Sequence, residues 1–378
     1  MKVKSYNSKS SEDLRQFLIE NSVEDFNPTL AIFFCDAQLD IPSLQIVLQE
    51  FKIDAIGTTT CGEIFDNKVK ESSCSIILME LDRKAYEIII EPFTEGEFET
   101  SKKVATIAKQ KFENPAIITY ASKIGVNGDS IVNGFKEILD SKIPIFGGLA
   151  GDNHRNEIFT VFHNSKSENE GLVTLIINND IVKVEGESYS GWTPLGKTHV
   201  VTKAIGNVLF EIDHLPALDL FIEYFGIEKS YSVNGESLEQ IPGMYSIKVI
   251  NEDNLEYMRS PLQYDNENHS LILGGEVQNG DKIKFCPIPD LEIVEETVDF
   301  FKSYSKLNSK VDALIINSCA GRKMAFGPMM SKEINEIYNI WKVPTVGFLA
   351  LGEIGRNANE NECSFHNVTC SLLTLTKV

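Results

Sequence analysis

Three segments of this chain repeat one pattern: an apolar strand ending in glycine, a loop of small residues, then glycine followed by a carboxylate. The copies span residues 53–63, 143–152 and 343–353, and they end on Glu63, Asp152 and Glu353. Three copies in the same order indicate three similar folding units. Because each loop follows a strand, the repeat also predicts where a binding site could form.

Each copy lies in a segment with strand and helix periodicity. Apolar runs predict strands at 29–35, 116–120 and 311–317, and apolar residues at helical spacing follow each run. Only one or two residues separate each helix from the strand of the repeat, which is typical of a βαβ crossover with two parallel strands. We therefore predict an α/β fold, with α+β as the alternative, built from repeated β-α-β-β units. Further patterns predict a strand pair at 73–81 and 85–91 and a single closing strand at 363–375.

The length of the chain predicts more than one domain. A chain of 378 residues exceeds one ordinary core, so we expect two domains with mixed sheets. The polar run 164–170 suggests a boundary after residue 170, which gives domains at 1–170 and 171–378. Residues 192–202 form a turn-rich ribbon, and 245–285 read as antiparallel strands between Asn, Asp and Gly turns.

Composition excludes several partners and settings. The formal net charge of −20 disfavours nucleic acid and anionic membrane surfaces, because both repel an acidic protein. The start of the chain has no apolar stretch typical of a signal peptide, and no run of about 18 apolar residues occurs. The seven cysteines contain no C-x-x-C pair, which favours free thiols in a reducing compartment over disulfides or zinc. We expect a cytoplasmic protein.

The three Gly-acid corners are the candidate ligand-binding residues, and the ligand is expected at these strand-end loops or in a cleft between the two domains. Ligands of parallel sheets bind at the carboxyl ends of the strands, where small residues let a ligand approach the backbone. If Glu63, Asp152 and Glu353 converge, their carboxylates could accept from an amine, while Arg322 could hold a carboxylate with two parallel bonds. Arg155 and Arg356 add positive charge three residues after two of the corners. Both signs together suit a zwitterion such as an amino acid. One such corner alone would be an ordinary turn.

Two alternative functions rest on single residues. Cys319 ends an apolar strand and precedes Gly321-Arg322, so a nearby cation could activate it as the nucleophile of a thiol-dependent enzyme. A buried inert thiol is the competing interpretation. His154 lies just past Gly151-Asp152 and could bind haem iron, although a solvated or hydrogen-bonded loop histidine is the favoured interpretation. No Walker loop, G-x-G-x-x-G, H-E-x-x-H or G-x-S-x-G motif occurs, and no metal site is predicted.

These residues resemble the FIST family, whose members combine a FIST N and a FIST C domain. The FIST N resemblance lies in Ile56-Gly57-Thr58-Thr59-Thr60-Cys61-Gly62-Glu63-Ile64 and Phe146-Gly147-Gly148-Leu149-Ala150-Gly151-Asp152. The FIST C resemblance lies in Gly191-Trp192-Thr193-Pro194-Leu195-Gly196, Ser318-Cys319-Ala320-Gly321-Arg322, Gly352-Glu353-Ile354 and Phe365-His366-Asn367. Together these segments cover nearly the whole chain in the expected order.

The resemblance implies a small-molecule sensor in signal transduction, with amino acids among the proposed ligands. Such modules are often fused to, or encoded beside, kinases, cyclic-dinucleotide enzymes and chemotaxis receptors, and some relatives bind haem. The chain leaves no room for an output domain after the paired domains. We therefore expect a stand-alone sensor that signals through a partner protein such as a kinase or a cyclic-dinucleotide enzyme. The cofactor, if any, is left open.

Overall fold

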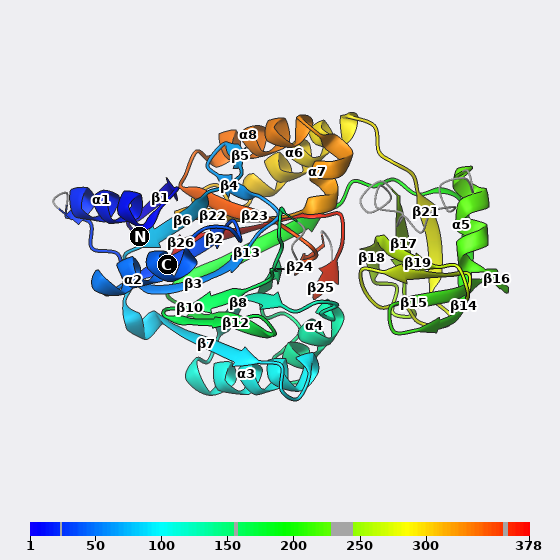
Figure 1. Ribbon diagram of the computed structural model, residues 1–378, viewed down its shortest axis with the longest axis horizontal. Helices are drawn as coiled ribbons and strands as arrows, with labels where there is room; N and C mark the ends of the chain where they lie inside the picture. Colours follow the sequence, from blue (N-terminus) through cyan, green and yellow to red (C-terminus); the bar gives the residue numbers. More distant parts are fainter. Residues whose placement is uncertain (23–24, 155–157, 228–244, 358–361) are drawn as a thin grey trace.

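The computed structural model describes residues 1–22, 25–154, 158–227, 245–357 and 362–378. Helices make up 26% and strands 41% of the chain, and the described strands form three mixed sheets and one antiparallel sheet. This confirms the predicted α/β class and the repeated β-α-β-β units. Three structurally similar units form a three-sheet body, and a smaller unit projects from one side of it (Figure 1).

The three units share one order of elements. The first comprises β1 (Val3–Ser8), α1 (Ser11–Ser22), β2 (Leu30–Cys35), α2 (Ile41–Glu50), β3 (Asp54–Thr59), β4 (Glu63–Phe65), β5 (Lys68–Lys70) and β6 (Cys74–Met79). The second, after η1 (Arg83–Ala85), comprises β7 (Tyr86–Pro92), α3 (Glu97–Lys111), β8 (Pro115–Ser122), α4 (Gly128–Lys136), β9 (Ile145–Leu149), β10 (Val161–His163), β11 (Lys166–Glu168) and β12 (Gly171–Asn178). The third comprises β13 (Val182–Tyr189), α6 (Glu292–Ser305), β22 (Ala313–Cys319), α7 (Ala320–Phe326), α8 (Met329–Trp341), β23 (Thr345–Ala350), β24 (Glu353–Arg356), β25 (Cys363–His366) and β26 (Cys370–Lys377).

Local sequence explains the crossovers. Each unit pairs two parallel strands, β2 with β3, β8 with β9 and β22 with β23. The first strand of each pair is buried along its whole length, as expected for a strand covered on both faces. In the first two units the connecting helix begins where a side chain caps the backbone: Asp40 accepts from the Ser43 amide at 3.2 Å, and Asn127 accepts from the Ser130 amide at 3.0 Å.

Each unit gives one hairpin to the sheet of another unit. Sheet I has the order β1-β6-β2-β3-β10-β11, sheet II β25-β24-β9-β8-β12-β7, and sheet III β13-β26-β22-β23-β4-β5. The hairpin β4–β5 of the first unit therefore extends the sheet of the third, β24–β25 of the third extends that of the second, and β10–β11 of the second extends that of the first. The exchange closes a ring of three interlocked sheets.

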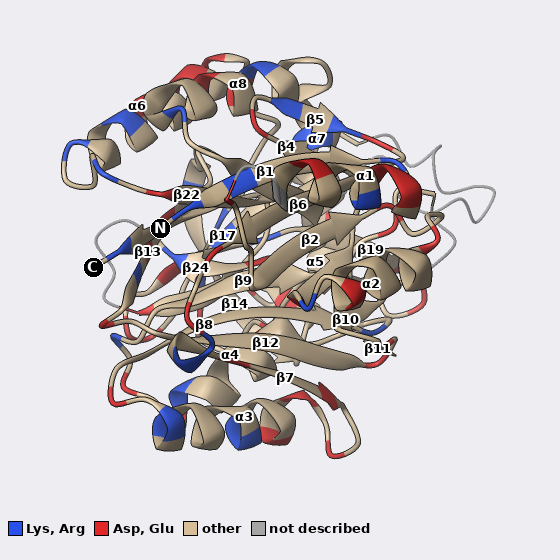
Figure 2. Ribbon diagram, turned by 90° about the vertical axis from the view of Figure 1, so that its left-hand side faces the viewer, with Lys and Arg blue, Asp and Glu red and all other residues tan. Residues whose placement is uncertain are grey.

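The three sheets enclose a common apolar core. It takes side chains from all three, and at its centre the rings of Phe34, Tyr120 and Phe348 contact one another with centroids 4.9–5.6 Å apart. The outer face of each sheet is covered by its own helices: α1 and α2 on sheet I, α3 and α4 on sheet II, and α6, α7 and α8 on sheet III. Charged residues are almost absent from the central strands and concentrate on helices and loops (Figure 2).

The remaining elements form an inserted unit between β13 and α6. It comprises β14 (Leu195–Ile205), β15 (Val208–Ile212), β16 (Leu215–Pro216), α5 (Ala217–Phe225), β17 (Ser246–Ile250), β18 (Glu256–Arg259), β19 (Pro261–Asp265), β20 (Ser270–Leu273) and β21 (Lys282–Cys286). Its strands form an eight-stranded sheet in which every described pair is antiparallel, and it has a separate core around Phe221 and Phe285. The expectation of antiparallel strands in this segment is confirmed.

Several local predictions were wrong. The segments 73–81 and 85–91 both contain strands, but β6 and β7 belong to different sheets and do not pair. The closing segment 363–375 is broken into β25 and β26, which also lie in different sheets. The ribbon at 192–202 contains most of the long strand β14, and α3 was not predicted. The apolar residues at 157–162 also predict a strand, whose first residue lies outside the described residues. None of the described helices has the length and apolar character needed to cross a membrane.

Candidate functional site

The three Gly-acid corners lie against one another where the hairpins cross between sheets. The Leu349 amide donates to the Gly62 carbonyl at 2.8 Å, and the Leu149 amide donates to the Gly352 carbonyl at 2.9 Å. The Gly151 amide completes the set by donating to the Thr59 carbonyl at 3.0 Å. The corners are therefore joined by backbone bonds between units, and not scattered over the surface.

The first glycine of each repeat is required by the close approach of the neighbouring strand. A Cβ atom at Gly57, Gly147 or Gly347 would lie 2.1, 1.7 or 1.9 Å from a backbone carbonyl oxygen of the parallel partner strand. No side chain fits at such a distance. The repeated glycine thus has a structural cause that is the same in all three units.

Glu63 and Glu353 are fully buried at the start of β4 and β24. Glu63 accepts from the Thr60 hydroxyl at 2.6 Å and from the Ser73 hydroxyl at 2.9 Å. Glu353 accepts from the Thr369 amide at 3.1 Å and from its hydroxyl at 2.9 Å. Burial raises the pKa of Glu63 to about 7 and that of Glu353 to about 8. Both carboxyls are held inside the protein, so neither is offered to solvent.

Asp152, the third corner acid, shapes its own loop. Its carboxylate accepts from the amides of His154 at 2.8 Å and Ile158 at 3.2 Å. The Nε2 atom of His154 lies 3.0 Å from both carboxylate oxygens of Asp36, so this ring nitrogen is already engaged. The haem hypothesis for His154 stays a prediction. Arg155 lies outside the described residues.

Arg322 is also buried and fully bonded. It forms an ion pair with Glu333, and it donates to the carbonyls of Ser190 at 2.6 Å and Val368 at 3.2 Å and to the Thr297 hydroxyl at 3.0 Å. These bonds join α7 to α6, to α8 and to the segment that follows β13. The guanidinium therefore holds these elements together and has little capacity left for a ligand carboxylate.

Cys319 lies beside Glu353 and close to Arg322. Its exposed fraction is 6%, and burial raises the pKa of the thiol well above its ordinary value. A thiol in this state is poorly suited to nucleophilic attack, and the thiol-enzyme hypothesis stays a prediction. Arg356, the remaining candidate cation, ends β24 and donates to the Lys142 carbonyl at 3.0 Å.

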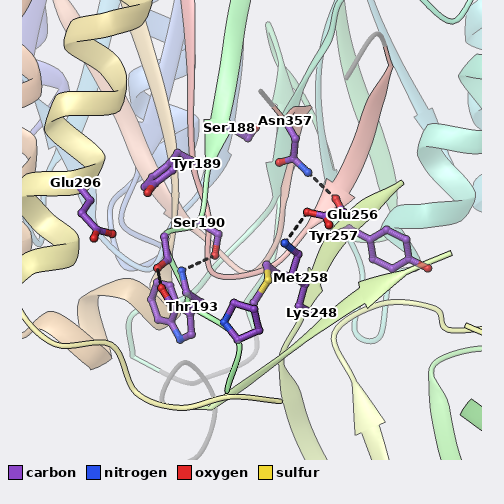
Figure 3. A pocket seen from close by; sticks show the side chains of 13 residues that line it. Ser188, Tyr189, Ser190, Thr193, Lys248, Glu256, Tyr257, Met258, Glu296 and Asn357 are labelled. Carbon is purple, nitrogen blue, oxygen red and sulfur yellow. Dashed lines mark hydrogen bonds and ion pairs between the residues drawn. The ribbon is translucent and has the colours of Figure 1, made fainter. Parts of the chain in front are cut away.

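The structure contains a cleft whose lining residues were not identified from the sequence. It has a volume of about 300 Å³ and lies between the three-sheet body and the inserted unit. The body contributes residues 188–194, Glu296 on α6 and Asn357, which follows β24. The inserted unit contributes Lys248, Glu256 and Met258 from the hairpin β17–β18. Figure 3 shows Tyr189 and Glu296 on one side of this cleft, with Lys248 and Glu256 on the other.

The cleft presents charges of both signs. The Lys248 ammonium lies 2.5 Å from the Glu256 carboxylate, and the Asn357 amide group donates to the Glu256 carbonyl at 2.6 Å. Glu296 forms no hydrogen bond or ion pair with any described residue. The floor adds Trp192, which is 4% exposed and whose indole N–H has no acceptor within the described structure. A buried donor without an acceptor is uncommon in native proteins.

The cleft lies directly in front of some of the site residues predicted from the sequence. Ser190 lines the cleft and accepts from Arg322 through its carbonyl, while the segment Val368–Thr369 connects Arg322 with Glu353. Arg322, Cys319 and Glu353 thus form one group behind the cleft, whereas Glu63 and Asp152 belong to the other corners. The motif at residues 191–194, which carried part of the family resemblance, lies in one wall. Lys248 and Glu256 gave no signal, because alternation in a strand does not indicate which face will meet another unit.

The described residues hold no group of three or more His, Cys, Asp or Glu side chains arranged to bind a metal ion.

A search of curated proteins finds no match to the chain. Comparison with protein-family models finds the FIST N domain over residues 29–215 and the FIST C domain over residues 217–356. Because the two models together match most of the chain, the protein belongs to the FIST family.

Proposed function

We propose that this protein is a small-ligand sensor whose ligand binds in the cleft between the three-sheet body and the inserted unit. FIST domains are associated with the sensing of small ligands in signal transduction. The observation that carries the proposal is the composition of the cleft, whose walls come from two parts of the molecule with separate cores. Sites between structural units are common positions for ligands, because a ligand there contacts both parts.

The cleft favours a zwitterion such as an amino acid. A ligand carboxylate would accept from the Lys248 ammonium, in competition with Glu256, and a ligand ammonium would face Glu296. Charge-assisted hydrogen bonds of this kind are about twice as strong as neutral ones. A ligand of one charge would use only one of these two groups, whereas a zwitterion gains both contacts.

Signalling would follow from the different affinities of the ligand for different placements of the inserted unit. A ligand that contacts both walls binds best when they are closest together, so it shifts the population toward that arrangement. The output would pass to a partner protein, such as a kinase or a cyclic-dinucleotide enzyme. A cytoplasmic setting is part of the proposal and is supported by the seven cysteines, all of which are free.

Isothermal titration with the twenty amino acids tests the proposal. We expect at least one to bind the wild-type protein, and Lys248→Met and Glu296→Gln each to weaken that binding by about tenfold or more. Lys282→Met and Glu292→Gln are matched controls, because they remove the same charges at exposed positions of the same two units and should leave affinity unchanged. No binding by any amino acid at millimolar concentration would refute the proposal.

A further inference from the structure

The hairpin β17–β18 separates two cavities. Glu256 and Met258 line the cleft, whereas Arg259 lines a second cavity of about 240 Å³ on the other side of the hairpin, next to α4. This follows from the alternation of side chains along β18. The position of this short hairpin therefore determines the shape of the cleft. Contacts that hold the hairpin on the side facing α4 also fix the side that faces the cleft.

Arg259 is the residue that holds the far face. It is 2% exposed, although arginine is seldom buried without a partner. Its guanidinium forms an ion pair with Asp129 at 2.6 Å and donates to the carbonyls of Glu276 at 3.0 Å and Phe365 at 2.9 Å. The ring of Tyr257 lies 4.2 Å from the centre of the guanidinium.

These partners belong to different parts of the molecule. Asp129 is in the first turn of α4, in the second unit, and Phe365 is in β25, in the third unit. Glu276 belongs to the inserted unit, and its amide donates to the other oxygen of Asp129 at 2.8 Å. One guanidinium therefore connects the inserted unit to two units of the body. The neighbouring Met258 carbonyl accepts from the Asn367 amide at 3.3 Å, which adds a second contact at the same place.

We propose that Arg259 is a positioning residue: through Asp129 it fixes β17–β18 as the wall of the cleft and thereby sets how open the cleft is. The consequence for ligand affinity rests on the function proposed above, whereas the effect on the hairpin does not. A buried ion pair suits this role, because its net contribution to stability is small while its geometry is specific. Such a contact can hold one arrangement without preventing another.

Trp192 provides a direct readout of the cleft. The chain has two tryptophans. Trp341 ends α8, donates to the Asn308 carbonyl and does not line the cleft, so Trp341→Phe leaves Trp192 as the sole indole fluorophore. In this background, acrylamide quenching measures the exposure of the cleft floor, and amide hydrogen exchange measures the opening of β17–β18. Asp129→Asn removes the charge with little change in shape, and Arg259→Met removes the guanidinium. Arg15→Met, which breaks an exposed ion pair with Glu50 on the first unit, is the control.

We expect Asp129→Asn and Arg259→Met each to raise the quenching constant of Trp192 and the exchange rate of β17–β18 several-fold, while the circular dichroism spectrum is retained. Arg15→Met should change neither the quenching constant nor the exchange rate. Unchanged quenching and exchange in Asp129→Asn, even with a lowered melting temperature, would overturn the proposal, because Arg259 would then be only a stabilising contact. If a bound amino acid is found, its affinity should fall by about the factor by which the closed population falls. If no amino acid binds the wild type, the proposed function fails while the quenching result still decides the role of Arg259.

Discussion

Individual residues of the repeat have roles that differ from those suggested by their chemistry. Glu63 and Glu353 are carboxyls at strand ends, yet both are buried and hydrogen-bonded inside the protein. Their first function is to fix the crossing points of the hairpins. The residue that seemed best suited to bind a carboxylate, Arg322, is likewise engaged with internal partners.

The raised pKa values of Glu63 and Glu353 predict a dependence of stability on pH. The ordinary value is 4.5, and the folded values are about 7 and about 8, so the folded chain holds these protons more tightly than the unfolded chain. Their contribution to stability is therefore complete below pH 4.5 and is lost as pH rises through about 7 and about 8. The full loss is on the order of 3 kcal/mol for Glu63 and on the order of 5 kcal/mol for Glu353.

Urea unfolding of the wild type and of Glu353→Gln at about pH 5 and about pH 8.5 measures this effect. We expect the wild type to lose more stability between the two conditions than the variant, by on the order of 2–4 kcal/mol, because glutamine cannot ionise. Glu113→Gln, at an exposed position, should behave like the wild type. Equal losses in the wild type and in Glu353→Gln would show that Glu353 does not titrate in this range.

At the scale of elements, the three βαβ crossovers could be predicted from the sequence, and the hairpin exchange could not. The crossovers follow from local signals: buried apolar runs, helical spacing and connections of one or two residues. The exchange depends on which strand each hairpin pairs with, and the sequences of β4 and β24 do not indicate the partner strand. For this reason 363–375 resembled one strand, although β25 and β26 diverge into different sheets.

The same limit applies to the candidate site. Of the site residues predicted from the sequence, Cys319, Arg322 and Glu353 lie directly behind the cleft, whereas residues 191–194 were noted only for the family resemblance. The sequence could not indicate Lys248, Glu256 or Arg259, because these become important only through the placement of the inserted unit against the body. Periodic sequence patterns indicate helices and strands. Contacts between two units that each have their own core produce no such pattern in the sequence.

Arg322 joins α7 to α6, to α8 and to the segment that follows β13 through its hydrogen bonds and its ion pair. Arg322→Met should lower the free energy of unfolding by about 3–5 kcal/mol, because it leaves Glu333 buried without its counter-ion. The double variant Arg322→Met/Glu333→Leu should recover much of that loss, since the two buried charges are then removed together. Urea unfolding measures both. A double variant as unstable as the sum of two single losses would show that the bonds to Ser190 and Val368 matter more than the ion pair.

At the scale of the whole molecule, the interlocked sheets bear on the domain division. The family models meet between residues 215 and 217, and the division into 1–170 and 171–378 stays a prediction. The strand pairing in sheet II makes this predicted division testable. Strand β12 begins at Gly171 and lies between β7 and β8 in sheet II, so a fragment of residues 1–170 lacks an inner strand of that sheet.

We therefore expect residues 1–170, expressed alone, to be largely unfolded or aggregated. The fragment would also lack β23, so the β4–β5 hairpin would have no edge to join, and it would expose strand edges in two sheets. Circular dichroism and size-exclusion chromatography provide the measurement, with the full chain as control. A fragment with a cooperative unfolding transition would show that the first unit is stable without the exchange.

The hairpin exchange also determines when the protein can mature during its synthesis. The amide of Thr345, at the start of β23, donates to the Asp66 side chain across 279 positions of sequence. Segments emerging early from the ribosome must therefore wait for the last unit before they find their neighbours, although many domains begin to fold from the N-terminus as they are made. Until then the β4–β5 hairpin has no strand edge to join, and we expect truncated translation products to stay incompletely folded and to be degraded.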